Sequence, residues 1–150
     1  MYSDEAMMRL VLEESERAFA LGEVPVACII TMGDRIISKA HNEKETGSCA
    51  TRHAEILAIE EASRILGAWR LQDCKMYVNL EPCLMCLGAI LESRIPELIY
   101  SLYDYRMGGI NGRFGIGEEK VKLTPLCVKS GVLISESKRI IQRFFREKRR

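Results

Sequence analysis

The chain has 150 residues, of which 47 % are hydrophobic and 29 % are charged, and its net charge is +1. This composition is typical of a soluble globular protein, and the length suits one core, so we expect a single domain over residues 1–150. No apolar run reaches the roughly 18 residues that cross a membrane, and the near-zero charge excludes a global basic field for nucleic acid. The first nine residues carry three charges and no apolar stretch, so we expect no secretory signal and a cytoplasmic protein.

The first third of the chain predicts a helix followed by two strands. Ser3 is a suitable N-cap with acidic residues after it, and Gly22 is a suitable stop for the helix. Residues 26–31 form a short apolar run rich in β-branched side chains, and residues 35–40 form a second run after a glycine turn. We therefore predict an amphipathic helix and two consecutive strands.

The middle of the chain predicts two helices, each followed by a strand. The polar stretch 41–50 predicts a loop, and the apolar spacing after it predicts a helix over 53–66. Residues 75–80 predict a strand. Residues 82–94 predict a helix that starts at a proline, because the first turn of a helix does not need the missing N–H. Residues 97–101 predict a fourth strand.

The last third is less regular. Residues 102–120 contain five glycines and no clear periodicity, which predicts an extended loop, and residues 126–129 predict a fifth strand. A terminal helix begins at Ser135, and we expect its inward side chains to be Ile140, Ile141, Phe144 and Phe145. The predicted order, α-β-β-α-β-α-β-β-α, indicates one sheet with helices packed against it.

Two short motifs indicate a metal site. His53-Ala54-Glu55 is followed by Pro82-Cys83-Leu84-Met85-Cys86. One imidazole and two thiolates supply three of the four tetrahedral positions of zinc and leave the fourth for water, as in a catalytic site. This pattern, H-x-E and then P-C-x-x-C, resembles the signature of the zinc nucleobase deaminases.

The predicted helices place these residues suitably. Cys83 and Cys86 are three residues apart at the start of a helix, so both thiols point the same way, and a helix N-terminus and a metal both favour the thiolate. His53 also begins a helix. We expect Glu55 to face the open position, to take a proton from water and to deliver it to a ring nitrogen and the leaving amine.

Less specific interpretations exist for each part of the pattern. A lone C-x-x-C can be a redox pair. A fourth protein ligand would make the zinc structural, and the candidates are His41, Cys49 and Cys74. Glu55 taken alone can be a capping or surface acid. The four cysteines outside the motif are expected to be small buried hydrophobes.

The end of the chain is basic. From Lys138 to Arg150 there are seven Lys or Arg residues and one Glu. One interpretation is a solvated helix face whose positive end suits the helix dipole. The other is contact with phosphates, since a local basic stripe matters more for binding than net charge.

Taken together, the chain resembles the cytidine-deaminase-like superfamily, and within it the bacterial tRNA-specific adenosine deaminases. The segments that carry the resemblance are Gly22–Val26, His41-Asn42, His53–Ala58, Leu80–Ile90, Ser93–Ile95 and Arg143–Arg146. The resemblance implies an α/β fold of three layers, α/β/α, with a five-stranded mixed sheet and helices on both faces. It also implies a homodimer with one zinc per subunit and no nucleotide cofactor, which hydrolyses adenosine to inosine at the wobble position of a tRNA anticodon and releases ammonia.

The resemblance further implies roles for single residues. It places Glu55 as the catalytic residue and His53, Cys83 and Cys86 as the metal ligands. The substrate-binding set that it implies is Val26, Asn42, Ala54 and Asp104, of which Asp104 lies in the loop that meets the anticodon. The RNA-contacting set is Arg143, Phe144, Phe145, Arg146 and Arg149.

Several positions depart from the tRNA enzymes. Those enzymes usually read Asp-Pro-Thr-Ala before the His, where this chain has residues 49–52, and usually have Thr at the position of Asn79. They usually have Asn-His where Leu123-Thr124 stands, and smaller or basic residues where Leu102 and Tyr103 stand. These departures concern which base is read, because the shape of the pocket sets the substrate.

Two alternatives therefore stay open. One is a deaminase of a free nucleobase or nucleoside, of the cytosine or guanine type, with a small closed pocket and no salt-sensitive RNA binding. The other is a structural zinc module or an inactive partner subunit, which the presence of Glu55 disfavours because binding alone has no need of it.

Overall fold

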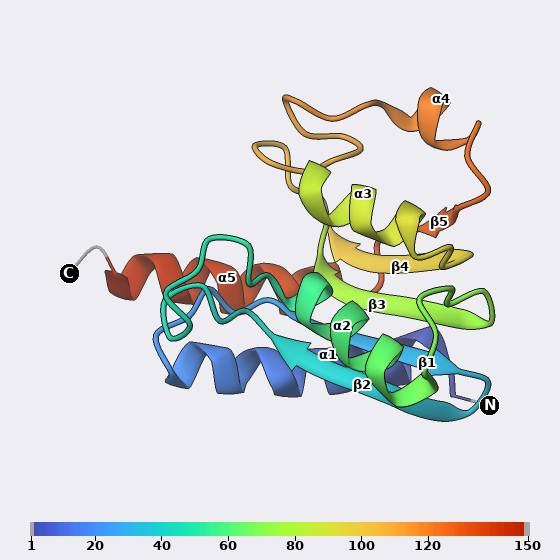
Figure 1. Cartoon of the computed structure of the whole chain (residues 1–150). Helices are drawn as coiled ribbons and strands as arrows, with labels where there is room; N and C mark the ends of the chain where they lie inside the picture. The colour runs from blue at the N-terminus through green and yellow to red at the C-terminus, as the bar shows by residue number, and fades with distance from the viewer. Residues whose placement is uncertain (1, 149–150) are drawn as a thin grey trace.

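The structure is a computed structural model that describes residues 2–148, and it consists of one sheet between two layers of helices (Figure 1). The elements in chain order are α1 (Asp4–Ala20), β1 (Ala27–Met32), β2 (Arg35–His41), α2 (Ala54–Leu66), β3 (Cys74–Leu80), α3 (Leu84–Glu92), β4 (Glu97–Leu102), α4 (Glu118–Val121), β5 (Cys127–Lys129) and α5 (Ile134–Lys148). Among these residues, no helix combines the length and the apolar character that crossing a membrane requires.

The sheet is mixed, with strand order β2-β1-β3-β4-β5. β1 is antiparallel to both β2 and β3, whereas β3, β4 and β5 run parallel to one another. Two helical crossovers connect the strands on one face: α2 lies between β2 and β3, and α3 lies between β3 and β4. This arrangement confirms the prediction of a five-stranded mixed sheet.

Side chains alternate between two cores, one on each face of the sheet. On the side of α1, Ile29, Tyr77 and Ile99 pack with the methionines of that helix. On the side of α2 and α3, the neighbouring strand positions, such as Ile30 and Met76, form the larger core. Figure 1 shows α1 and α5 on one face and α2 and α3 on the other. The three-layer prediction is therefore confirmed.

The helices α2 and α3 both begin at the same end of the sheet, and this fact positions the site. His53 is the N-cap of α2, with φ −78° and ψ 152°, and Cys83 is the N-cap of α3, with φ −71° and ψ 174°. Both residues thus stand in extended backbone just before a helical turn. Pro82 precedes this N-cap, so α3 begins slightly later than the sequence predicts.

Three expectations need correction, and a fourth cannot be compared with the structure. The extended loop predicted over 102–120 ends in a short helix, α4. Phe145 is not packed inward but is 45 % exposed, because it lies one position from Phe144, which occupies the buried face of α5. Cys49 and Cys127 are exposed, although Cys28 and Cys74 are buried as expected. Arg149, which we predict to contact RNA, lies outside the described residues.

Candidate metal and active site

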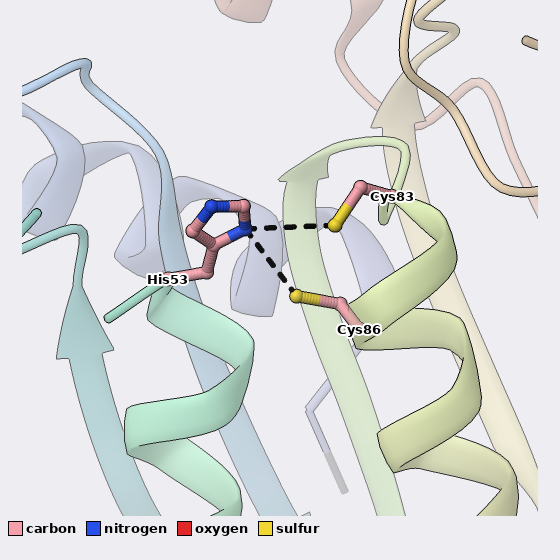
Figure 2. A group of neighbouring side chains, drawn as sticks. All are labelled: His53, Cys83 and Cys86. Carbon is pink, nitrogen blue, oxygen red and sulfur yellow. Dashed lines mark hydrogen bonds between the residues drawn. The ribbon is translucent and has the colours of Figure 1, made fainter. Parts of the chain in front are cut away.

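The structure gathers His53, Cys83 and Cys86 at the N-termini of α2 and α3 (Figure 2). His53 Nδ1 lies 3.6 Å from Cys83 Sγ and 3.5 Å from Cys86 Sγ. All three donor atoms lie within 4.8 Å of one another. Figure 2 shows the imidazole of one helix facing the two thiols of the other.

These distances suit a tetrahedral metal ion. Zinc binds nitrogen at about 2.0–2.1 Å and sulfur at about 2.3 Å, so a nitrogen and a sulfur on one tetrahedral ion lie about 3.6 Å apart. The two nitrogen–sulfur distances agree with that separation. Within residues 2–148, the group has three members, and the candidates for a fourth protein ligand, His41, Cys49 and Cys74, are not among them. The donor set therefore fits a metal ion with one position open to water or substrate.

The pKa values of the three side chains favour the binding of a metal cation. A hydrogen bond from Cys86 lowers the pKa of Cys83 to about 4, against the effect of burial, and a hydrogen bond from His53 adds to the effect. The same hydrogen bond and burial raise the pKa of Cys86. The hydrogen bond to Cys83 raises the pKa of His53. These shifts favour the thiolate of Cys83, which is the form that binds a metal, and a divalent ion would displace protons from the other two ligands.

Glu55 lies in the first turn of α2, where its side chain is 4 % exposed. Burial raises the pKa of Glu55 to about 7, and the negative charge of Cys83 acts in the same direction. A carboxyl group in such surroundings changes its protonation readily near neutral pH. Its position, in the same cavity as the metal-binding group, suits a proton carrier.

Glu55 and two of the metal-binding residues, His53 and Cys83, line one cavity of about 360 Å³. All four residues of the expected substrate-binding set line this cavity: Val26, Asn42, Ala54 and Asp104. The sequence did not single out six further lining residues, which are Val24, Lys44, Leu80, Glu81, Arg106 and Met107. Two of these, Lys44 and Arg106, are exposed cations that lie two residues after Asn42 and Asp104. That spacing is the only signal in the sequence by which they could have been found.

The buried amide of Asn79 supports one wall of the cavity. Its Oδ1 accepts a hydrogen bond from the N–H of Ala27 at 2.9 Å, and its Nδ2 donates one to the carbonyl of Pro25 at 2.9 Å. Between these two anchors lies Val26, whose carbonyl accepts the N–H of Asn42 at 3.0 Å. Asn79 therefore fixes the segment that presents Val26 and holds the backbone of Asn42.

The basic helix α5 lies outside the cavity, packed against α1. Arg143 Nη2 lies 2.7 Å from Glu16 Oε2, and its guanidinium stands 4.2 Å over the ring of Phe19. Phe144 is buried and meets Phe19 edge to face. Two of the expected RNA contacts thus attach α5 to α1, whereas Phe145 and Arg146 are exposed.

Known proteins are similar to this chain in sequence and in fold. The tRNA-specific adenosine deaminase of Bacillus subtilis is 37 % identical over 150 residues, which cover all of this chain and 93 % of the relative. A structure from work on A-to-I editing by tRNA:A34 deaminases at the wobble position of transfer RNA superposes with a TM-score of 0.80 and 33 % identity, over 89 % of this chain and 96 % of that one. The guanine deaminase of Nitrosomonas europaea superposes with a TM-score of 0.85 over 96 % of this chain and 85 % of that one, but at 24 % identity this likeness concerns the fold alone.

The mixed sheet and the His-Cys-Cys group with a buried glutamate define a deaminase with the cytidine-deaminase-like fold. The family can be stated more narrowly. The chain belongs to the MafB19-like deaminase family, whose profile matches residues 2–149.

Proposed function

We propose that this chain, as one domain over residues 1–150, is a zinc-dependent hydrolytic deaminase that converts adenosine to inosine at the wobble position of a tRNA anticodon and releases ammonia. The observation that carries the proposal is that Glu55 lines one cavity with His53 and Cys83, two members of a His-Cys-Cys group of tetrahedral spacing. The choice of tRNA as substrate rests on the similarity to a tRNA-specific adenosine deaminase that matches the chain over its whole length.

In this proposal His53, Cys83 and Cys86 hold one zinc ion per subunit. Zinc bound in such a set supplies an activated water by lowering the pKa of that water toward neutrality. The Glu55 carboxylate removes one proton from the attacking water and delivers it to the ring nitrogen; it then takes the remaining proton of the new C–OH group and passes it to the amino group, which leaves as ammonia as the C–N bond breaks and the C=O bond forms. Burial raises the pKa of Glu55 to about 7, so both of its forms are accessible near neutral pH: the carboxylate accepts a proton and the neutral acid donates it.

The cavity residues orient the base. Val26 and Ala54 give apolar walls, and the side chain of Asn42 offers a hydrogen-bonding edge to the ring. An adenosine can reach this cavity only when it is splayed out of its stack, as bases of single-stranded loops can be. The exposed cations Lys44 and Arg106 then stand at the rim, where phosphates of flanking nucleotides pass.

Two further properties belong to the proposal. The exposed side chains Phe145 and Arg146, together with Arg149, contact RNA beyond the anticodon, while Arg143 and Phe144 hold α5 on α1. We also expect a cytoplasmic homodimer without a nucleotide cofactor. The exposed neighbours Leu84 and Met85, at the start of α3, are apolar surface that such a dimer would bury.

The test uses the purified protein with a tRNA that carries adenosine at the wobble position. The matched control is the same tRNA with guanosine at that position, and the comparison set is a panel of free bases and nucleosides. We expect inosine and ammonia from the first tRNA alone. Ammonia from cytosine or guanine, and none from the tRNA, would establish the free-base alternative instead.

A further inference from the structure

The buried carboxylate of Glu81 is surrounded by backbone N–H groups of one distant loop. Glu81 is 2 % exposed and immediately precedes Pro82. Its Oε1 accepts the N–H of Asp104 at 3.1 Å, and its Oε2 accepts the N–H groups of Ile110 and Asn111 at 3.0 and 2.8 Å. Within residues 2–148 no cationic side chain forms an ion pair with this carboxylate, so the three N–H donors compensate its charge.

The same loop, residues 104–111, also contacts Pro82 and Cys83, at the start of α3, through its backbone. The N–H of Gly109 donates to the carbonyl of Pro82 at 2.7 Å, and Cys83 forms an isolated β-bridge with Gly108. A Cβ at Gly108 would lie 2.3 Å from Glu81 Oε2, which leaves no room for any side chain there. The loop and the start of α3 therefore close on each other around the Glu81 carboxylate.

This loop presents residues to the cavity. Asp104, Arg106 and Met107 all line it. The N–H groups of Arg106 and Met107 donate to Asp104 Oδ1 at 3.1 and 3.0 Å, so the turn that carries these side chains is tight. Glu81 holds this turn at its first residue, Asp104, and again just beyond it, at Ile110 and Asn111.

We propose that Glu81 is a positioning residue, which fixes the substrate-facing loop 104–111 on the metal-binding segment and thereby preorganises it for the polynucleotide. The inference rests on the proposed function for the identity of that substrate. Proton transfer belongs to Glu55 and metal binding to His53, Cys83 and Cys86, so the loss of Glu81 affects substrate binding more than turnover of the bound substrate.

Glu81→Gln isolates this role because it keeps the size of the side chain. An amide has one accepting oxygen, and that oxygen retains most bonds by facing Ile110 and Asn111. The NH₂ group then faces the N–H of Asp104, and this hydrogen bond is lost. We expect hydrogen exchange at the Asp104 amide to rise by about 10-fold or more, with smaller increases at the other two amides.

Gly108→Ala tests the same contact from the loop side, because its Cβ displaces the loop from the carboxylate. Two matched controls leave the contact alone. Glu92→Gln changes an exposed glutamate at the end of α3, and Gly88→Ala adds a Cβ in α3 that meets no atom within 4 Å. Neither control residue lines the cavity.

The experiment compares these variants with the wild type by residue-resolved hydrogen exchange, zinc content, and kcat and KM for the wobble-adenosine tRNA. For Glu81→Gln and Gly108→Ala we expect faster exchange in the loop, one zinc per chain, and a KM raised by about 10-fold with kcat within about threefold. Both controls should match the wild type.

Unchanged loop exchange in Glu81→Gln would overturn the inference, and so would a fall in kcat with KM and loop exchange unchanged. Should Glu81→Gln fail to fold, Gly108→Ala decides by the same readouts. A wild-type protein that leaves tRNA unmodified refutes the proposed function, whereas the exchange comparison still decides whether Glu81 fixes the loop.

Discussion

Replacing Asn79 perturbs a buried support of the cavity wall at a point where the chain departs from the tRNA enzymes. Asn79 is fully buried, and both ends of its amide are used, on the N–H of Ala27 and on the carbonyl of Pro25. Asn79→Leu keeps the branched shape of the side chain but can neither accept nor donate a hydrogen bond. The backbone groups of Ala27 and Pro25 then remain buried without these partners.

The expected magnitude follows from those two groups. A buried polar group left without its hydrogen bond costs about 1–3 kcal/mol, so Asn79→Leu should lower the free energy of unfolding by about 2–6 kcal/mol. That is a large share of the roughly 5–15 kcal/mol that stabilises a typical domain. Asn79→Thr, which introduces the usual residue of the tRNA enzymes, keeps one short hydroxyl and should cost about 1–2 kcal/mol.

The assay is urea unfolding followed by circular dichroism at one fixed excess of zinc, because metal binding itself adds to the apparent stability. The order wild type, Asn79→Thr, Asn79→Leu is expected, with equal slopes against urea. The kinetic counterpart is a raised KM in both variants, since Asn79 holds the segment that carries Val26. A loss below about 1 kcal/mol for Asn79→Leu, or equal losses for the two variants, would refute the reasoning.

Three further outcomes are expected. Glu55→Gln should keep one zinc per chain but lower kcat by about 10²–10⁴-fold, because the amide cannot carry the proton; near-normal turnover with full zinc would disprove that role. Cys83→Ala and Cys86→Ala should each lose zinc by elemental analysis, and full retention would show that the ligand set is wrong. Arg146→Ala should weaken tRNA binding and reduce the salt dependence of log K by about one unit of slope, whereas an unchanged slope would mean that Arg146 touches no phosphate.

The metal-binding group could be predicted from the sequence because its geometry is mostly local. Two cysteines three residues apart at a helix start must point the same way, and the proline before them marks that start. The meeting of His53 with them is not local, but it follows once both helices begin at one end of a single sheet. Periodicity indicated that sheet, although the strand order came only with the structure.

The loop after β4 could not be predicted in the same way. Its glycines remove periodicity, and its shape depends on Glu81, which lies 23 to 30 residues before the amides that it binds. In the sequence Glu81 directly precedes Pro82, so nothing distinguishes it from the neighbouring metal-binding motif. Its role becomes visible only when the three donors are brought around it.

The terminal helix shows how a correct element can still carry a wrong assignment. Neighbouring helical positions differ by about 100°, so Phe144 and Phe145 cannot both point into one narrow core. Arg143, for which we predict a contact with phosphate, forms an ion pair with Glu16, 127 residues earlier, and its contact with RNA stays a prediction. One arginine of the basic stripe thus also holds the helix on α1.

These differences bear on how substrate choice is built into the fold. The groups expected to carry the chemistry, Glu55 and the His-Cys-Cys set, keep the deaminase pattern without change. By contrast, Asn79 and Glu81 contact no substrate atom in the proposed mechanism; they hold the segments that do. Asn79 holds the cavity wall at Val26, and Glu81 holds the loop 104–111. Because neither residue binds the metal, the wall and the loop can change while the metal-binding group stays the same. In this chain, therefore, we expect substitutions at these two anchors to change the KM for the substrate while the metal-binding group and the proton transfer stay the same.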